Sequence, residues 1–189
     1  MDIKFLFLKL FWKKLTLIDQ ENAVKTKNNG CPKCGSPLHV ANYDRLPRGG
    51  PNFLIDQKIL RFSLCCSKAG CRRRVMPPSV RFLGRNIYWG AIFLIASIMT
   101  KKLNSLQSKA TENIFAISRQ TLQRWGHFWK NKFPKSRFWK RSKGLFSEMI
   151  SVFPKGLFDF YHKFNKSTES TVIALLKFLS DLKLSDFSS

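Results

Sequence analysis

Five cysteines in two short motifs are the residues of this 189-residue chain best suited to chemistry. Cys31 and Cys34 lie in CPKCG, and Cys65, Cys66 and Cys71 lie in CCSKAGC. Two cysteine pairs separated by a loop are typical ligands of one tetrahedral zinc ion. Such an ion stabilises a module that is too small to build a core of its own. The sequence therefore predicts structural Zn²⁺.

The expected ligands are Cys31, Cys34, Cys66 and Cys71. Cys65 is the other option for the third position, and His39 could replace one thiolate. An odd cysteine count is more typical of a reducing compartment than of a disulfide framework. A redox-active CxxC pair would have to open a helix after a strand, and the polar Asn-Gly segment before the first cysteine fits that poorly.

The segment 118–133 has the pattern of a helix that reads DNA. Ser118 is a good N-cap, and Leu122, Trp125 and Trp129 recur at helical spacing, so they should face a core. The side chains expected to point outward are Arg119, Gln120, Gln123, Arg124 and His127, with Lys130 placed for phosphate. Arginine bonds guanine and glutamine bonds adenine in the major groove.

A preceding helix over 104–115 and a turn at Ala116 and Ile117 complete the predicted helix-turn-helix, whose second helix enters the major groove. An ordinary amphipathic helix with a solvated basic face is the alternative.

The second cysteine motif is followed by Arg72, Arg73 and Arg74, and then by Arg81 and Arg85. These side chains could clamp phosphate. The alternative is that they brace the cysteine module against the helices.

The charge balance supports a polyanionic partner, because 34 Lys and Arg oppose 11 Asp and Glu, a net charge of +23. DNA, RNA and anionic membranes are the candidates. Double-stranded DNA is the expected partner, with a transposase or a second copy of the chain as a further one; membrane binding is not expected. The expected location is the cytoplasm, in association with the nucleoid.

The predicted fold class is α+β: a small zinc ribbon with short strands, then a mostly α-helical helix-turn-helix domain and a C-terminal helix. Residues 25–82 form the zinc-ribbon-like module, which begins with a polar linker at 25–30 and has strands over 38–42 and 59–65. Residues 86–134 form the helix-turn-helix domain, which opens with an apolar helix over 87–103. Residues 135–189 form a helical tail with a final helix from about 168 to 184. One apolar stripe of this helix is expected to comprise Val172, Leu175, Leu176, Leu179 and Leu182.

The remaining segment, 1–24, is an apolar leader punctuated by lysines. It lacks the uninterrupted apolar core and the cleavage site of a signal peptide. It could lie as a helix on a partner or on a membrane surface, or it could be sequence read upstream of the true start.

No catalytic residues are predicted, because the acids are scattered and form no recognisable triad for two divalent metal ions. The chain is therefore not expected to be an enzyme.

The order of CPxCG, a second cysteine cluster, an arginine-rich exit and a helix-turn-helix resembles the N-terminal DNA-recognition part of bacterial insertion-sequence transposases. The stretches LHVANYDRLPRGGP, CCSKAGCRRRVMPPSVRFLGRNIYWGA, ISRQTLQRWGHFW and ALLKFLSDL are similar to a group of small transposon-associated helix-turn-helix proteins. The resemblance covers roughly 31–184 and implies mobile-element DNA binding, without an active site. Ala116 stands in the turn where this motif commonly has glycine.

The expected function is thus that of a zinc-stabilised DNA-binding protein, a transposase-like accessory or remnant of a mobile element. The alternatives are a host transcriptional regulator of the same architecture, a true transposase or nuclease with dispersed carboxylates, and a membrane-surface protein.

Overall fold

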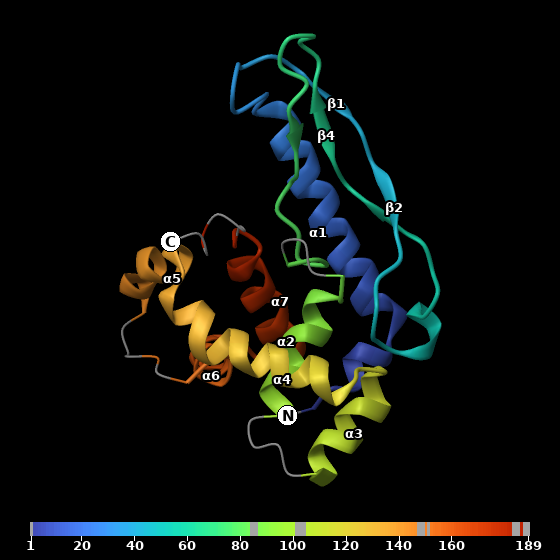
Figure 1. The fold of residues 1–189 in the computed structure, drawn as a ribbon, viewed down its shortest axis with the longest axis vertical. Coiled ribbons are helices and arrows are strands. Elements are labelled where there is room, and N and C mark those ends of the chain that lie inside the picture. Colours follow the sequence, from blue (N-terminus) through green and yellow to red (C-terminus); the bar gives the residue numbers. More distant parts are fainter. Residues whose placement is uncertain are drawn as a thin grey trace.

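A computed structural model describes residues 2–83, 87–100, 105–146, 150, 152–182 and 186. Within these ranges the chain forms seven α-helices and five short strands. Figure 1 shows a helical body from which a narrow head extends, built from the strands and the end of the first helix. The chain is therefore α+β, as the sequence predicts.

The α-helices are α1 (Lys9–Asn28), α2 (Gly90–Met99), α3 (Ser105–Phe115), α4 (Arg119–His127), α5 (Arg137–Ser142), α6 (Lys155–His162) and α7 (Thr168–Leu179). The strands are β1 (Leu38–Val40), β2 (Tyr43–Arg45), β3 (Ile59–Arg61), β4 (Leu64–Cys66) and β5 (Arg74–Val75).

Two small antiparallel sheets make up the head. One has the order β1-β4-β5, with Leu38 opposite Cys66, and the other pairs β2 with β3. The strand predicted over 38–42 ends at Val40, and the strand predicted over 59–65 is divided into β3 and β4, which belong to different sheets. Between these two predicted strands the structure forms β2, in which Tyr43 and Arg45 pair with β3 before the chain reaches Pro47.

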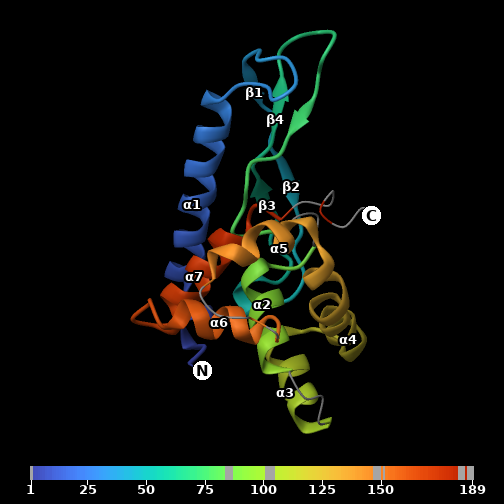
Figure 2. The same cartoon turned by 90° about the vertical axis from the view of Figure 1, so that its left-hand side faces the viewer.

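The first helix, α1, contains most of the predicted leader and packs into the core of the body. Phe11, Trp12 and Leu15 are buried, and the Trp12 ring meets the Trp89 ring edge-on at 4.8 Å between centroids. Figure 2 shows α1 running from the body along the head. The prediction of a linker at 25–30 is wrong over most of this segment. Its polar residues extend α1 to Asn28, and the chain turns only at Gly30.

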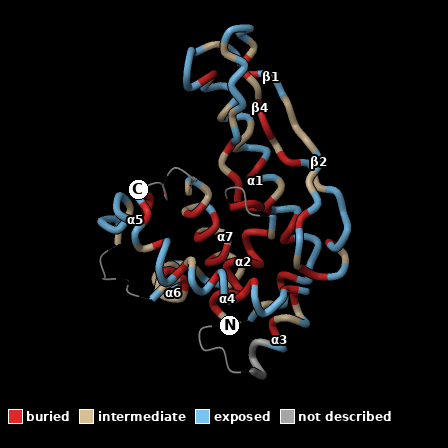
Figure 3. The backbone as a smooth tube through the Cα atoms, viewed as in Figure 1, coloured by how far each residue is buried: buried red, intermediate tan, exposed pale blue. Residues whose placement is uncertain are grey.

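The centre of the body is α2, which is buried on all sides. The apolar helix expected over 87–103 begins at Gly90, because the carbonyl of Ile87 instead accepts a hydrogen bond from the backbone nitrogen of Arg48. Residues 101–104 lie outside the described residues. Figure 3 shows how the buried residues concentrate in the body, while the tip of the head is largely accessible.

The last helix, α7, packs its apolar stripe into the same core. Val172, Leu175, Leu176 and Leu179 are fully buried, as their spacing predicts. The helix ends at Leu179, earlier than expected. A methyl group added to Gly90 would lie 3.2 Å from the Leu176 side chain, so glycine allows α2 and α7 to approach closely.

A buried carboxylate ties α1 to the chain that leaves the head. Asp19 accepts hydrogen bonds from the Ser79 hydroxyl at 2.6 Å, the Val80 backbone nitrogen at 2.7 Å and the Arg81 Nε at 2.8 Å. Arg81 also donates to the Leu60 carbonyl at 3.0 Å.

This network corrects the expectation that Arg81 could clamp phosphate, because its side chain is buried and braces the head against α1. Arg85 lies outside the described residues. The network was missed by sequence reasoning, although an aspartate one helical turn after the buried Leu15 was the available signal.

Of the helices that the structure describes, none combines the length and the apolarity that crossing a bilayer requires.

Candidate functional site

Four cysteine sulfurs gather at the tip of the head. The Sγ atoms of Cys31, Cys34, Cys66 and Cys71 all lie within 4.8 Å of one another. Cys31 and Cys71 are 3.8 Å apart, and Cys34 and Cys66 are 3.5 Å apart. Sulfurs around a tetrahedral ion with bonds of about 2.3 Å would lie about 3.8 Å apart. The cluster therefore has the dimensions of a four-thiolate metal site.

The first cysteine pair is held in a tight turn. The Cys31 backbone nitrogen donates to the Ser36 carbonyl at 2.9 Å, and the Gly35 nitrogen donates to the Cys31 carbonyl at 2.8 Å. Gly30 and Gly35 both have a φ of +71°, which favours glycine. A Cβ on Gly30 would also lie 2.8 Å from the Gly35 carbonyl oxygen, so this turn requires glycine there.

The second pair spans the end of β4 and the turn that follows it. The backbone nitrogens of Cys71 and Arg72 both donate to the Lys68 carbonyl, at 2.9 and 3.0 Å. Arg72 has a φ of +43°, so the chain reverses immediately after Cys71. This turn accommodates the longer spacing between the second two cysteines and brings Cys71 beside Cys31.

Strand alternation decides which cysteine of the adjacent pair joins the cluster. Cys66 lies on the face of the sheet that carries Leu38 and Leu64, and it is fully buried. Cys65 lies on the other face, where its sulfur is 3.6 Å from the Arg72 carbonyl. His39 is opposite Cys65 and exposed, so it is not part of the cluster.

The environment acts unequally on the four thiols. Hydrogen bonds from Ser36 lower the pKa of Cys34 to about 6. A hydrogen bond from the Lys33 backbone lowers the pKa of Cys31, whereas burial raises the pKa of Cys66 to about 12. Because metals bind the thiolate, a cation here would have to displace the proton of the Cys66 thiol.

The head has a very small apolar core of its own. Cys31, Leu38, Leu64 and Cys66 form a buried cluster separate from that of the body. Two leucines bury too little surface to hold three short strands together. A bound ion would supply the missing stabilisation.

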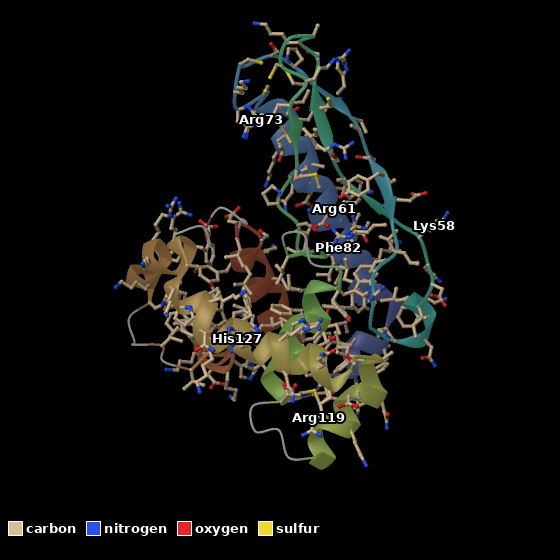
Figure 4. All side chains as sticks on the ribbon, viewed as in Figure 1. Lys58, Arg61, Arg73, Phe82, Arg119 and His127 are labelled. Carbon is tan, nitrogen blue, oxygen red and sulfur yellow. The ribbon has the colours of Figure 1, made fainter. Side chains whose placement is uncertain are left out.

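The three arginines after the cluster, Arg72, Arg73 and Arg74, are exposed. The Arg74 guanidinium lies over the Tyr43 ring, 5.4 Å from its centroid. Figure 4 places Arg73 at the tip of the head, next to the sulfurs. The cysteine cluster thus positions a cationic surface.

The helix α4 has one buried and one exposed face. The Ser118 hydroxyl accepts a hydrogen bond from the Thr121 backbone nitrogen at 3.4 Å and caps the helix, as predicted. Leu122, Trp125 and Trp129 are buried, as their spacing predicts. The residues expected to face outward, and found exposed, are Arg119, Gln120, Gln123, Arg124, His127 and Lys130. Figure 4 shows Arg119 and His127 along this part of the chain.

Two details of this region differ from a regular pair of helices. Ala116 has a φ of +51°, the conformation for which glycine is better suited. The helix predicted over 118–133 is regular only to His127 and continues as a wider π-helical turn over Phe128–Lys132. This turn keeps Trp129 and Phe133 in the core, with their ring centroids 4.9 Å apart.

Gly126 was missed by sequence reasoning. It lies inside α4, and a Cβ added there would meet no heavy atom within 4 Å. A glycine in the middle of a helix was the available signal.

Within the described ranges, the four cysteines are the one group of three or more His, Cys, Asp or Glu residues placed to share an ion.

Comparison with protein-family models, with curated proteins and with solved structures gives no match.

Proposed function

We propose that the chain is a zinc-stabilised protein that binds double-stranded DNA, a transposase-like accessory or remnant of a mobile element that acts at the nucleoid in the cytoplasm. The resemblance of its motifs to transposon-associated proteins supports the mobile-element part of this proposal. The net charge of +23 supports a polyanionic partner.

Zinc is the proposed ion because four thiolates are soft ligands, and zinc accepts four of them in a tetrahedron. The sulfur separations of 3.5 and 3.8 Å are consistent with such a site. Closed four-thiolate sites are structural, so the ion would hold the head together and take no part in a reaction.

The observation that carries the proposal is the exposed face of α4. Five polar or basic side chains line it, Lys130 follows in the π-helical turn, and the other face is fixed in the core by Leu122 and Trp125. A tight turn at Ala116 joins α3 to this helix, as in a helix-turn-helix. Arg119 and Gln123 would bond base edges in the major groove.

The exposed arginines of the head would bind the phosphate backbone. Arg72, Arg73 and Arg74 follow the cysteine cluster directly and are all exposed, and such contacts add affinity without sequence preference. Zinc would therefore raise the affinity for DNA indirectly, by holding these arginine side chains in position.

A DNA-binding assay at several salt concentrations tests the proposal. The logarithm of the affinity should fall linearly with the logarithm of salt, by about 0.9 for each phosphate neutralised. Arg119→Ala and Gln123→Ala should each reduce preference for the selected sequence by about 1–3 kcal/mol. Arg73→Ala should weaken binding to all DNA sequences alike and reduce the slope of log affinity against log salt by about one.

The matched control is Lys166→Ala, which removes an exposed positive charge just before α7. Its sequence preference should equal that of the wild type. Affinity that does not change with salt would contradict the proposal, and so would an equal loss of sequence preference in Arg119→Ala and Lys166→Ala.

A further inference from the structure

A pocket of about 530 Å³ lies between α4, the end of α2 and the segment that leads into α6. Binding sites for small organic molecules typically measure about 300–1,000 Å³. Figure 4 marks His127, one of the residues that line it. The pocket therefore opens beside the exposed face of α4 and is large enough for a molecule of moderate size.

The pocket combines an aromatic wall with a polar and cationic one. Phe153 contributes a partly buried aromatic ring and Val152 an exposed apolar side chain, whereas Trp129 is buried beside the pocket. Gln123, His127 and Lys130 contribute the polar groups. The residues that line it include no carboxylate. An occupant with a flat apolar part and a negative charge would match both walls.

The polar groups have hydrogen-bonding capacity left. The Asn131 amide pairs with the His127 Nδ1 at 3.1 Å, which leaves the Nε2 of this ring for an occupant. Lys155 also lines the pocket, but its ammonium group pairs with Asp159, one helical turn later. Lys130 is exposed and is the cation we assign to an anionic ligand.

Gly126 keeps the pocket open. It lines the pocket from inside α4, where glycine costs helix stability relative to every ordinary residue except proline. No positive φ and no close neighbour requires glycine at this position, since an added Cβ would meet nothing within 4 Å. What the missing side chain provides is space in the pocket.

We infer that this pocket binds a single nucleotide, with its base against Phe153 and its phosphate at Lys130. Bases stack on aromatic side chains, and glutamine bonds base edges. The inference rests on the proposed function, since the pocket shares Gln123, His127 and Lys130 with the face that would read DNA. The nucleotide is either free or an unpaired residue of a DNA strand, which costs least to place in a pocket.

The experiment uses the full chain and three probes: deoxyadenosine monophosphate, a blunt duplex, and the same duplex with one unpaired adenosine at its end. Titration calorimetry should detect binding of the mononucleotide. A preference for the overhang duplex would identify the strand as the source, and equal binding of the two duplexes would identify the free nucleotide. Either result, together with mononucleotide binding, supports the pocket.

The test variant is Gly126→Leu, which fills the pocket, and the matched control is Gly144→Leu, an exposed glycine outside the pocket that also has no neighbour within 4 Å. Gly126→Leu should bind the mononucleotide at least ten-fold more weakly and lose any overhang preference. Gly144→Leu should match the wild type. Leucine favours a helix over glycine, so the thermal unfolding midpoint should not fall.

A second test uses the wild-type protein alone, so it remains decisive even if Gly126→Leu does not fold. Deoxyribose 5-phosphate lacks the base and should bind at least ten-fold more weakly than the mononucleotide. Equal binding of these two ligands would overturn the inference, and so would unchanged mononucleotide binding by Gly126→Leu. Failure of the wild type to bind the blunt duplex would contradict the proposed function, while the mononucleotide titrations would still decide on the pocket.

Discussion

Cys65 and Cys66 are adjacent in the chain and differ in every structural respect. Cys66 is buried among the other three sulfurs, and Cys65 faces away, near the Arg72 carbonyl. A shift of one residue in the register of β4 would exchange them, because side chains alternate between the faces of a strand. The pairing of Leu38 with Cys66 therefore selects the cysteine that belongs to the cluster.

This arrangement predicts opposite effects of two serine substitutions on the zinc content of the protein. Cys34→Ser removes one of the four clustered thiols, so the purified variant should hold less than half of the zinc found in the wild type. Cys65→Ser should keep the full amount, since Cys65 is outside the cluster. Elemental analysis after gel filtration measures both, and a normal zinc content in Cys34→Ser would exclude Cys34 as a ligand.

At the scale of elements, α4 is short and depends on its ends. It has nine residues, and isolated helices of this length are marginal in water. Its capping serine and the burial of Leu122 and Trp125 supply the stability that helix propensity alone does not provide. The exposed residues of the helix are thus free to serve other purposes than stability.

The cap gives a prediction for this element. Ser118→Ala should lower the free energy of unfolding by about 1 kcal/mol, because the Thr121 backbone nitrogen loses its side-chain acceptor. Ser118→Gly should cost only a few tenths of a kcal/mol, since glycine is tolerated at an N-cap. Urea denaturation measures the difference, and equal losses in the two variants would show that the hydroxyl does not stabilise the helix.

At the scale of the whole molecule, α1 connects the head to the body. One end of α1 packs Phe11, Trp12 and Leu15 into the body core, and the other end leads through Gly30 into the cysteine cluster. Between them, Asp19 bonds the chain that returns from the head. The position of the cationic tip relative to α4 therefore depends on this buried network.

Asp19→Asn should destabilise the protein by about 3–5 kcal/mol, because it leaves the buried Arg81 and Arg61 side chains without their carboxylate. The matched control is Asp159→Asn, whose partner is the partly exposed Lys155 on the same helix. That substitution should cost no more than about 0.5 kcal/mol. Guanidinium denaturation measures both, and losses of similar size would mean that the buried network contributes little.

Local patterns predicted those parts of the fold that depend on neighbours in the chain. The CxxC spacing, the Ser118 cap and the apolar spacing of α4 and α7 act within a few residues, and the described structure agrees with each. Element ends were less predictable. The polar residues 25–28 extend α1, and residues 87–89 lie in an extended segment held by Arg48, because contacts with distant segments set these boundaries.

By itself, the amino-acid sequence determined the chemical groups of this protein: the cysteine pairs, the excess of positive charge and the polar face of one helix. Tertiary structure alone decided which groups meet. It brought Cys66 to the cluster and left Cys65 out, buried Arg81 against Asp19, and brought Phe153 and Gly126 to one pocket. The reason is that strand register, burial and pocket shape depend on residues far apart in the chain, whereas helix periodicity and caps depend on residues three or four positions apart.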